Sequence, residues 1–290
     1  MRIVLVLAVT LIACSKAPKP RPAEDAHEVE DPAELAASLD ARCVAGDIEA
    51  CRRLGVMYAE GTGVAPDPKR ASQLFERACN AGNMIACNSY ALALAEGLGI
   101  SRDPARAVLT FQKACDGGYR LACRTLGLMF RDGRGMGVDL ARAEALLDKA
   151  CKGGVPSACT NAGDLEMSLA AKSSNGMLKA ALGHYKQGCD AGDPAACRHR
   201  GLAYLEGKGV ARSPSAAAMW LERACMPDDA VACRVLGEMV MQGSGVPRDI
   251  DHGRALLSRA CDAKDEEACR LLRATSEPGA PSDAGASDAH

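Results

Sequence analysis

Cysteine is the residue type in this chain whose spacing most clearly points to chemistry. Fourteen of the fifteen cysteines form seven C-x7-C pairs, and successive pairs begin 36 residues apart, except for one step of 38. The pairs are Cys43 and Cys51, Cys79 and Cys87, Cys115 and Cys123, Cys151 and Cys159, Cys189 and Cys197, Cys225 and Cys233, and Cys261 and Cys269. A fixed period of this length is typical of a repeat array built from one supersecondary unit.

Disulfide formation explains these pairs better than metal binding. Zinc sites need short Cys or His knuckles in pairs, and seven isolated C-x7-C pairs without matching histidines do not supply them. Residues eight apart in one continuous helix lie about 12 Å apart along its axis, whereas a disulfide needs Cα atoms within about 7 Å. Turn signals such as Gly117-Gly118 lie between the cysteines. We therefore predict that each disulfide forms within its own pair and joins the end of one helix to the start of the next.

The segments between the cysteine pairs have the pattern of two helices. In the first unit, apolar residues recur at helical spacing in one block containing Leu54 and Met57 and in a second containing Leu74 and Phe75. A G-x-G turn separates the blocks, and an Asp or Ser that can cap the second helix follows it. These capping residues are Asp67, Asp103, Asp139, Ser213 and Asp249. Because no segment shows strand alternation or a hairpin signal, the predicted fold class is all-α.

This pattern resembles the Sel-one-like repeat, a relative of the tetratricopeptide repeat. The matching motif is A-x-x-L-G-x-x-Y/F-x-x-G-x-G-V-x-x-D-x-x-R-A, and the added C-x7-C staple is similar to the cysteine-rich secreted members known from Helicobacter. The resemblance covers Leu35 to Leu272 and implies a right-handed solenoid of helix hairpins. The fourth unit departs from the motif, with Leu169 and Ala171 at the glycine positions and two extra residues. We expect its turn at Ser173-Ser174-Asn175-Gly176.

The fifteenth cysteine, Cys14, belongs to a different kind of motif. A basic start and an apolar run from Ile3 to Ile12 precede Cys14, and the run has the length of a signal segment rather than a membrane span. The ending Leu-Ile-Ala-Cys resembles a bacterial lipobox, which implies that Cys14 is lipidated. An ordinary secretory signal with a spare thiol is the alternative. Export agrees with bridged cysteines, because envelope compartments are oxidising.

These observations divide the chain into four parts. Residues 1–13 are a predicted signal peptide, and residues 14–31 a lipidated, disordered tether rich in Pro, Lys, Ala and Glu. Residues 32–274 form the repeat array, which comprises a cap helix, six helix pairs and a closing cap helix. Residues 275–290 are a second predicted disordered segment. The expected location is the bacterial envelope, at the outer membrane, on the periplasmic side or at the surface.

Catalytic signatures are scarce. The sequence has no H-E-x-x-H, G-x-S-x-G or Walker loop, and no S-x-x-K, S-D-N or K-T-G. His184 and His199 fall in the irregular fourth and fifth units, without a nucleophile paired to them by motif. A net charge of −2 and 3% aromatic residues argue against nucleic acid. We expect a monomer without cofactor or metal. A β-lactamase-like or penicillin-binding hydrolase remains an alternative that only the resemblance to cysteine-rich relatives implies.

One pattern indicates a surface. The position after the second cysteine carries an arginine in five units: Arg52, Arg124, Arg198, Arg234 and Arg270. If the first helices line the concave face, as they do in related superhelices, this stripe can bind an acidic partner or peptide carboxylate. Alternatively, each arginine pairs with an acid of a neighbouring repeat, such as Glu60, Glu96, Asp132 or Glu206. The predicted function is a lipid-anchored scaffold that binds a protein or peptide.

Overall fold

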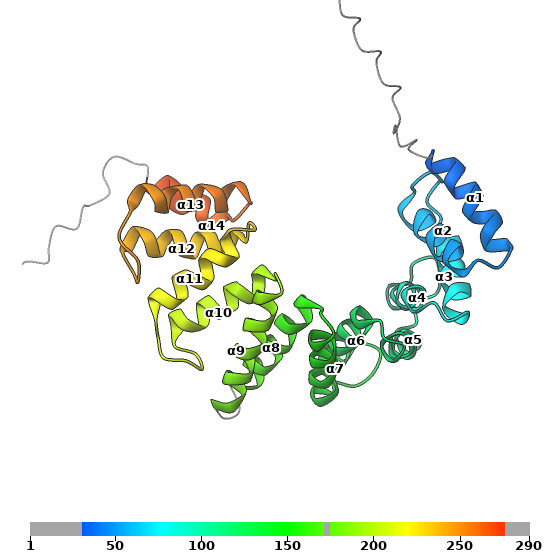
Figure 1. The fold of residues 1–290 in the computed structure, drawn as a ribbon, viewed down its shortest axis with the longest axis horizontal. Coiled ribbons are helices and arrows are strands. Elements are labelled where there is room, and N and C mark those ends of the chain that lie inside the picture. Colours follow the sequence, from blue (N-terminus) through cyan, green and yellow to red (C-terminus); the bar gives the residue numbers. More distant parts are fainter. Residues whose placement is uncertain (1–30, 171–174, 276–290) are drawn as a thin grey trace, which may run out of the picture.

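The chain folds into a curved array of helices. The computed structural model describes residues 31–170 and 175–275, and within these ranges it contains fourteen helices and no strand. Successive helices pack in sequence order, each against the one before and the one after. Figure 1 shows the resulting arc, with α1 (Pro32–Val44) at one tip and α13 (Ile250–Asp262) and α14 (Glu266–Ala274) at the other. The prediction of an all-α repeat solenoid is confirmed.

Six helix pairs lie between α1 and α14. The first helices of the pairs carry the second cysteine of each C-x7-C motif, and the second helices end at the next pair. The first helices are α2 (Ile48–Glu60), α4 (Met84–Glu96), α6 (Arg120–Asp132), α8 (Pro156–Ala170), α10 (Pro194–Glu206) and α12 (Ala230–Gln242). The second helices are α3 (Pro68–Asn80), α5 (Pro104–Asp116), α7 (Leu140–Lys152), α9 (Asn175–Asp190), α11 (Pro214–Cys225) and α13 (Ile250–Asp262).

The second helices begin where the capping residues predict. The carboxylate of Asp67, for example, accepts a hydrogen bond from the backbone N–H of Arg70 at 2.9 Å. Asp103, Asp139, Ser213 and Asp249 cap their helices through the same bond to the third residue that follows. Such a bond satisfies one of the N–H groups that a helix start leaves without a partner. The five predicted caps are therefore confirmed.

All seven cysteine pairs are bridged within themselves. Their Cα atoms lie 4.4–4.7 Å apart, and each bridge joins the last turn of one helix to the start of the next. The bridges join Cys43 to Cys51, Cys79 to Cys87, Cys115 to Cys123, Cys151 to Cys159, Cys189 to Cys197, Cys225 to Cys233, and Cys261 to Cys269. This is the predicted pairing in every case. A protein with this many disulfides belongs to an oxidising compartment outside the cytoplasm.

The bridges are part of the core rather than of the surface. Four of the bridged cysteines are fully buried at 0% exposure: Cys51, Cys87, Cys123 and Cys233. The pair nearest the C-terminus, Cys261 and Cys269, is partly buried. The second cysteine of each pair lies in the first turn of a first helix, and its neighbour in the chain is a position of the arginine stripe. Each bridge therefore fixes where a first helix starts on the preceding second helix.

Glycines of the repeat motif serve close packing. A Cβ atom at Gly55 would lie 2.7 Å from the ring of Phe75, so the glycine makes room for a side chain of the paired helix rather than for its backbone. The second glycine of each G-x-G turn also has an inter-repeat role. Gly99 has φ +68°, and a Cβ there would lie 2.1 Å from the backbone of Pro68 in the preceding unit. The turn therefore docks on the start of the previous second helix.

The fourth unit differs from its neighbours as expected, although its turn is placed differently. Helix α9 begins at Asn175, so Asn175 and Gly176 belong to a helix, and the prediction that they form the turn is wrong. Ser173 and Ser174 lie outside the described residues, as do the predicted signal segment, Cys14, the tether up to residue 30 and the tail from residue 276. Among the helices described, none is long and apolar enough to cross a membrane.

Candidate binding surface

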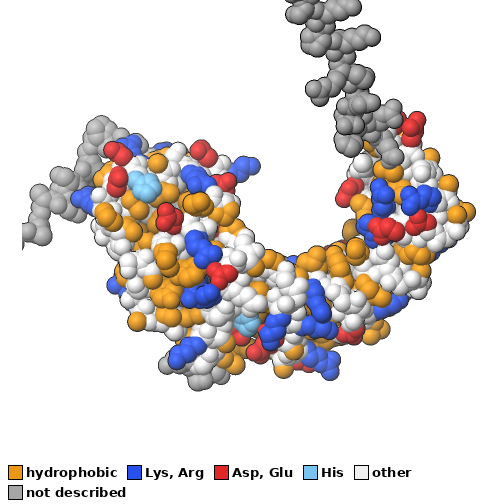
Figure 2. All heavy atoms as spheres, viewed as in Figure 1, with side chains coloured by type: hydrophobic (Ala, Val, Ile, Leu, Met, Phe, Trp, Pro, Cys, Tyr) orange, Lys and Arg blue, Asp and Glu red, His pale blue; other side chains and the backbone are white. Residues whose placement is uncertain are grey.

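In the first half of the array, first helices form the inner side of the arc. Figure 1 shows α4 and α6 nearer the hollow of the arc than α5 and α7, and α8 also contacts α10. Three large apolar side chains of these inner helices are unusually exposed: Ile85 and Leu121 at 44% each, and Leu92 at 40%. Figure 2 shows hydrophobic side chains along the inner edge over α4 and α6. Exposed apolar groups that gather on one surface are typical of an interaction site.

The predicted arginine stripe is partly buried and paired with acids or amides. Arg198 donates to Asp229 at 2.6 Å and Arg234 to Asp265 at 3.2 Å, each across to the next repeat. Each of these arginines has a side chain only 22% exposed. Arg124 donates to Asn161 of the next repeat at 2.8 Å. The geometry therefore matches the alternative in which these arginines pair with residues of a neighbouring repeat. The acidic partners suggested from the sequence are wrong, because other residues accept these bonds.

The two ends of the stripe pair locally. Arg52 forms an ion pair with Glu49 in its own helix, and Arg270 does the same with Glu267. Arg270 belongs to the last helix described, and its side chain is 71% exposed. The stripe therefore does not present five equivalent cations to a ligand.

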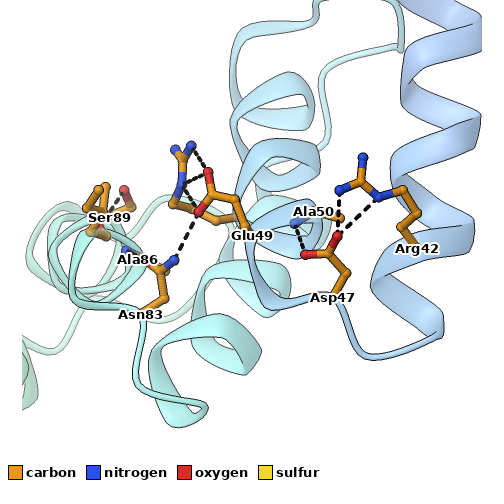
Figure 3. Close-up of polar contacts among 9 residues, drawn as sticks. Arg42, Asp47, Glu49, Ala50, Asn83, Ala86 and Ser89 are labelled. Atoms are coloured by element: carbon orange, nitrogen blue, oxygen red, sulfur yellow. Dashed lines mark hydrogen bonds and ion pairs between the residues drawn. The ribbon is translucent and has the colours of Figure 1, made fainter.

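The arginines are fixed because their acidic partners are themselves fixed as helix caps. Asp229 and Asp265 cap α12 and α14 through one carboxylate oxygen, and the other oxygen accepts the arginine of the preceding repeat. In the first unit, Glu49 plays a related part by accepting from Asn83, the cap of α4 (Figure 3). These caps of the first helices were not predicted. Their sequence signal is an Asp or Asn four residues before the second cysteine.

A cluster of charged residues that the sequence did not predict lies in the irregular fourth unit. His184 of α9 is 2.8 Å from the carboxylate of Glu166 through Nδ1 and 3.4 Å from Asp148 through Nε2. Both ring nitrogens face acceptors, so the imidazolium form satisfies the site. The contact with Glu166, a carboxylate buried to 5% exposure, raises the pKa of His184 although burial opposes the shift. Lys152 also binds Asp148, at 2.7 Å.

A second polar group lines a hollow between α8, α9 and α10. The hydroxyl of Tyr185 donates to Asp164 Oδ1 at 2.8 Å, and Nδ1 of His199 lies 2.8 Å from the same oxygen without the alignment of a good hydrogen bond. The hollow has a volume of about 370 Å³ and is also lined by Met167, Ser168, Leu202, Ala203, Glu206 and Lys208. Burial opposes ionisation of Asp164, but its contacts with His199 and Tyr185 lower the pKa overall.

Neither histidine cluster has the composition of a hydrolase site. Within residues 31–170 and 175–275, no serine or cysteine donates a hydrogen bond to His184 or His199, and the Ser168 hydroxyl donates to the Leu165 carbonyl. In the same ranges, no group of three or more His, Cys, Asp or Glu is arranged to hold a metal ion. The hydrolase alternative gains no support from this geometry.

The repeat geometry agrees with a comparison against protein families. The Sel1 repeat model matches residues 48–83, 85–119, 120–155, 194–226 and 230–265, which is more than half of the chain. The chain belongs to the Sel1 repeat family. The unmatched stretch of the Sel1 array, residues 156–193, holds α8 and α9 and therefore both His184 and Asp164. Proteins of this family are repeat scaffolds that generally bind other proteins. No curated protein sequence matches the chain.

Solved structures share the Sel1 fold. A protective antigen of uropathogenic Escherichia coli strains is 25% identical with a TM-score of 0.75; the match covers 85% of this chain and 53% of the antigen, so the chain spans about half of that protein's length. A Sel1 repeat protein from Oxalobacter formigenes is 29% identical with a TM-score of 0.74, and the match covers 85% of this chain and 70% of that one. Cysteine-rich protein B of Helicobacter pylori is 21% identical, with a TM-score of only 0.36. That match covers 43% of this chain and 94% of the Helicobacter protein.

Proposed function

We propose that this chain is an exported, lipid-anchored scaffold that binds a protein or peptide on the inner side of its arc. The observation that carries the proposal is the exposed apolar set Ile85, Leu92 and Leu121 on the inner helices α4 and α6. Large apolar side chains gain free energy when a partner removes them from water, at about 25 cal/mol per Å² of apolar area. A disulfide at every junction between helix pairs holds the surface in one shape, which lowers the entropy lost on binding.

Export and anchoring form the second part of the proposal. Seven disulfides are stable in an envelope compartment and would be reduced in most cytoplasms. Cys14, which carries no partner within the C-x7-C pattern, is the expected lipid attachment site.

A pair of matched double variants tests the binding surface. The variant Ile85→Glu/Leu121→Glu places charges on the inner helices, and we expect it to lose binding to the envelope partner recovered with the wild type. The control Leu109→Glu/Met219→Glu alters residues that are more exposed, at 70% and 52%, on the second helices α5 and α11. The control should retain binding. Equal loss in both variants, or in neither, would contradict the proposed surface.

Fractionation tests the anchor separately. We expect Cys14→Ser to leave the chain unprocessed or to move it from the membrane to the soluble fraction. Cys43→Ala/Cys51→Ala, which removes one disulfide of the array, serves as the control. A Cys14→Ser chain that is processed normally and stays fully on the membrane would contradict lipid anchoring. That result would leave the binding surface untouched, because the anchor and the inner helices are different parts of the chain.

A further inference from the structure

We infer that the hollow between α8, α9 and α10 is a binding site for a cationic side chain, a lysine of the partner protein, held by the carboxylate of Asp164. The inference rests on the proposed function and adds the chemistry of one contact. It is carried by the Tyr185–Asp164–His199 group, which occupies positions that are apolar or uncharged in the neighbouring units.

Asp164 stands at an apolar position of the repeat. It lies five residues after the second cysteine, where α4 and α6 carry Leu92 and Leu128. Asp164 therefore replaces an apolar residue on the same side of the array, and its side chain is 37% exposed to the hollow and the solvent. Tyr185 likewise stands where α5 and α7 carry Phe111 and Leu147. Two coordinated replacements exchange an apolar contact for a hydrogen-bonded carboxylate.

The protein holds one oxygen of the Asp164 carboxylate in place. Tyr185 is 3% exposed and donates its hydroxyl to Oδ1, next to Nδ1 of His199. Among the described residues, no donor is bonded to Oδ2 of Asp164. One oxygen is thus fixed by the protein, and the other is left for a ligand. A fixed carboxylate binds a donor with less loss of entropy than a mobile one.

The charged groups that line the hollow are mainly acidic. Asp164 and Glu206 are carboxylates, and Lys208, the one ammonium in the lining, is paired with Glu206 at 2.5 Å. The hollow also lies beside the last turns of α8 and α10, where helix dipoles place partial negative charge. The hydrogen bond from Arg198 to Nε2 of His199, at 3.1 Å, makes that nitrogen an acceptor. Arg131 lies close enough to lower the pKa of Asp164 but is itself paired with Asp132 at 2.7 Å, which leaves the second oxygen of Asp164 for a cation.

The shape of the hollow also suits a lysine side chain. Met167, Leu202 and Ala203 give the hollow apolar walls beside the carboxylate. The aliphatic stem of a lysine can lie against such walls while its ammonium reaches Oδ2. A volume of about 370 Å³ accommodates a side chain of this length and excludes a folded domain.

Small probes test the site on the oxidised full chain by nuclear magnetic resonance. We expect Nα-acetyl-lysine N-methylamide to shift the ring resonances of Tyr185 and His199, and the norleucine analogue, which has the same stem without the charge, to bind at least about fivefold more weakly. High salt should weaken the lysine probe alone. Equal binding of both probes, or no shift with either, would overturn the inference.

Variants and a competing ligand complete the test. Asp164→Asn should remove the preference for lysine over norleucine, whereas Glu238→Gln, at the same position of α12, should keep it because Glu238 is paired with Arg234 outside the hollow. Tighter binding of the free diamine cadaverine than of the lysine probe would mean a polyamine site and overturn the assignment to a peptide side chain. Failure of Asp164→Asn to change partner binding, with Ile85→Glu/Leu121→Glu still disruptive, would sink this inference and leave the proposed function standing.

Discussion

The third and fourth units use the same helix positions for opposite chemistry. Seven residues after the second cysteine, the third unit carries Phe130 and the fourth carries Glu166. Five residues before the next cysteine, the corresponding pair is Leu146 and His184. Phe130 and Leu146 pack into the same apolar cluster, whereas Glu166 and His184 form an ion pair at 2.8 Å. The residues at these two facing positions thus differ together between the units. The helix hairpin forms either with an apolar pair or with an ion pair at these positions.

The apolar residues of the regular units and the polar residues of the fourth unit serve different purposes. Apolar pairs such as Phe130 and Leu146 stabilise the regular units without specifying a ligand. The polar groups of the fourth unit are costly to bury, and a buried ion pair stabilises a fold no better than well-packed apolar residues of the same volume. Asp164 and Tyr185 of this unit also line the hollow, which is consistent with a use other than stability.

The largest expected effect comes from breaking the buried pair on one side. His184→Leu leaves Glu166 buried without its cation, and we expect the free energy of unfolding at pH 7 to fall by about 3–5 kcal/mol. The double variant His184→Leu/Glu166→Phe copies the third unit and should recover most of that loss. Denaturant titrations of the two variants and the wild type measure both values. A double variant as unstable as the single one would show that the two units are not interchangeable.

Removing one disulfide tests what the two units share. Each bridge closes a loop of the same length, so the loop-entropy model predicts a loss of about 2–3 kcal/mol for any pair. Cys115→Ala/Cys123→Ala in a regular unit and Cys189→Ala/Cys197→Ala next to the hollow should therefore cost similar amounts by thermal unfolding. If the stability losses of the two variants differ by more than the predicted loss of about 2–3 kcal/mol, strain or cavities rather than loop closure set the stabilisation by each bridge.

The ion pair of His184 and Glu166 should add its own pH dependence to the stability of the chain. Because the pKa of His184 is raised in the folded chain, its stabilisation is fully present below about pH 6.5, its unfolded value, and is lost as the pH rises through the folded pKa. The wild type should therefore lose stability relative to His184→Leu/Glu166→Phe between neutral and alkaline pH. Parallel curves for the two proteins across this range would contradict the ion pair.

The smallest effect concerns the arginine stripe. Arg234→Gln removes a partly buried link to the cap of the next helix, and we expect a loss of about 1 kcal/mol. Arg270→Gln serves as the matched control, because Arg270 is 71% exposed and its pair should contribute little. Urea midpoints distinguish the two. If Arg234→Gln is as harmless as the control, the contact between repeats does not stabilise the array.

The fold was predictable because its signals are local and repeated. The C-x7-C spacing, the G-x-G turns and capping residues such as Asp67 each constrain a few neighbouring residues, and seven copies of the cysteine spacing remove ambiguity. The caps of the first helices were equally visible, since Asp229 and Asp265 lie four residues before a cysteine. Their second role, binding the arginine of the preceding repeat, depends on how repeats stack and has no short-range signal.

The polar hollow was not predictable for a related reason. Asp164, Tyr185 and His199 come from three helices and are separated by up to 35 residues, so no motif spans them. The sequence did indicate that the fourth unit departs from the pattern and that His184 and His199 fall near it. Aligning that unit with its neighbours position by position would have shown charged residues at apolar positions, which is the available signal.

Site-specific photocrosslinking in intact cells tests the central claim, that the inner side of the arc is the binding surface, most directly. A photoreactive residue is placed at Leu92 or Leu121 on the inner helices, or at Leu109 or Met219 on the second helices, with one substitution per chain. The account predicts a discrete crosslinked product from the inner positions that the positions on the second helices do not give. Equal crosslinking from Leu109 and Met219, or product from those positions alone, would contradict it.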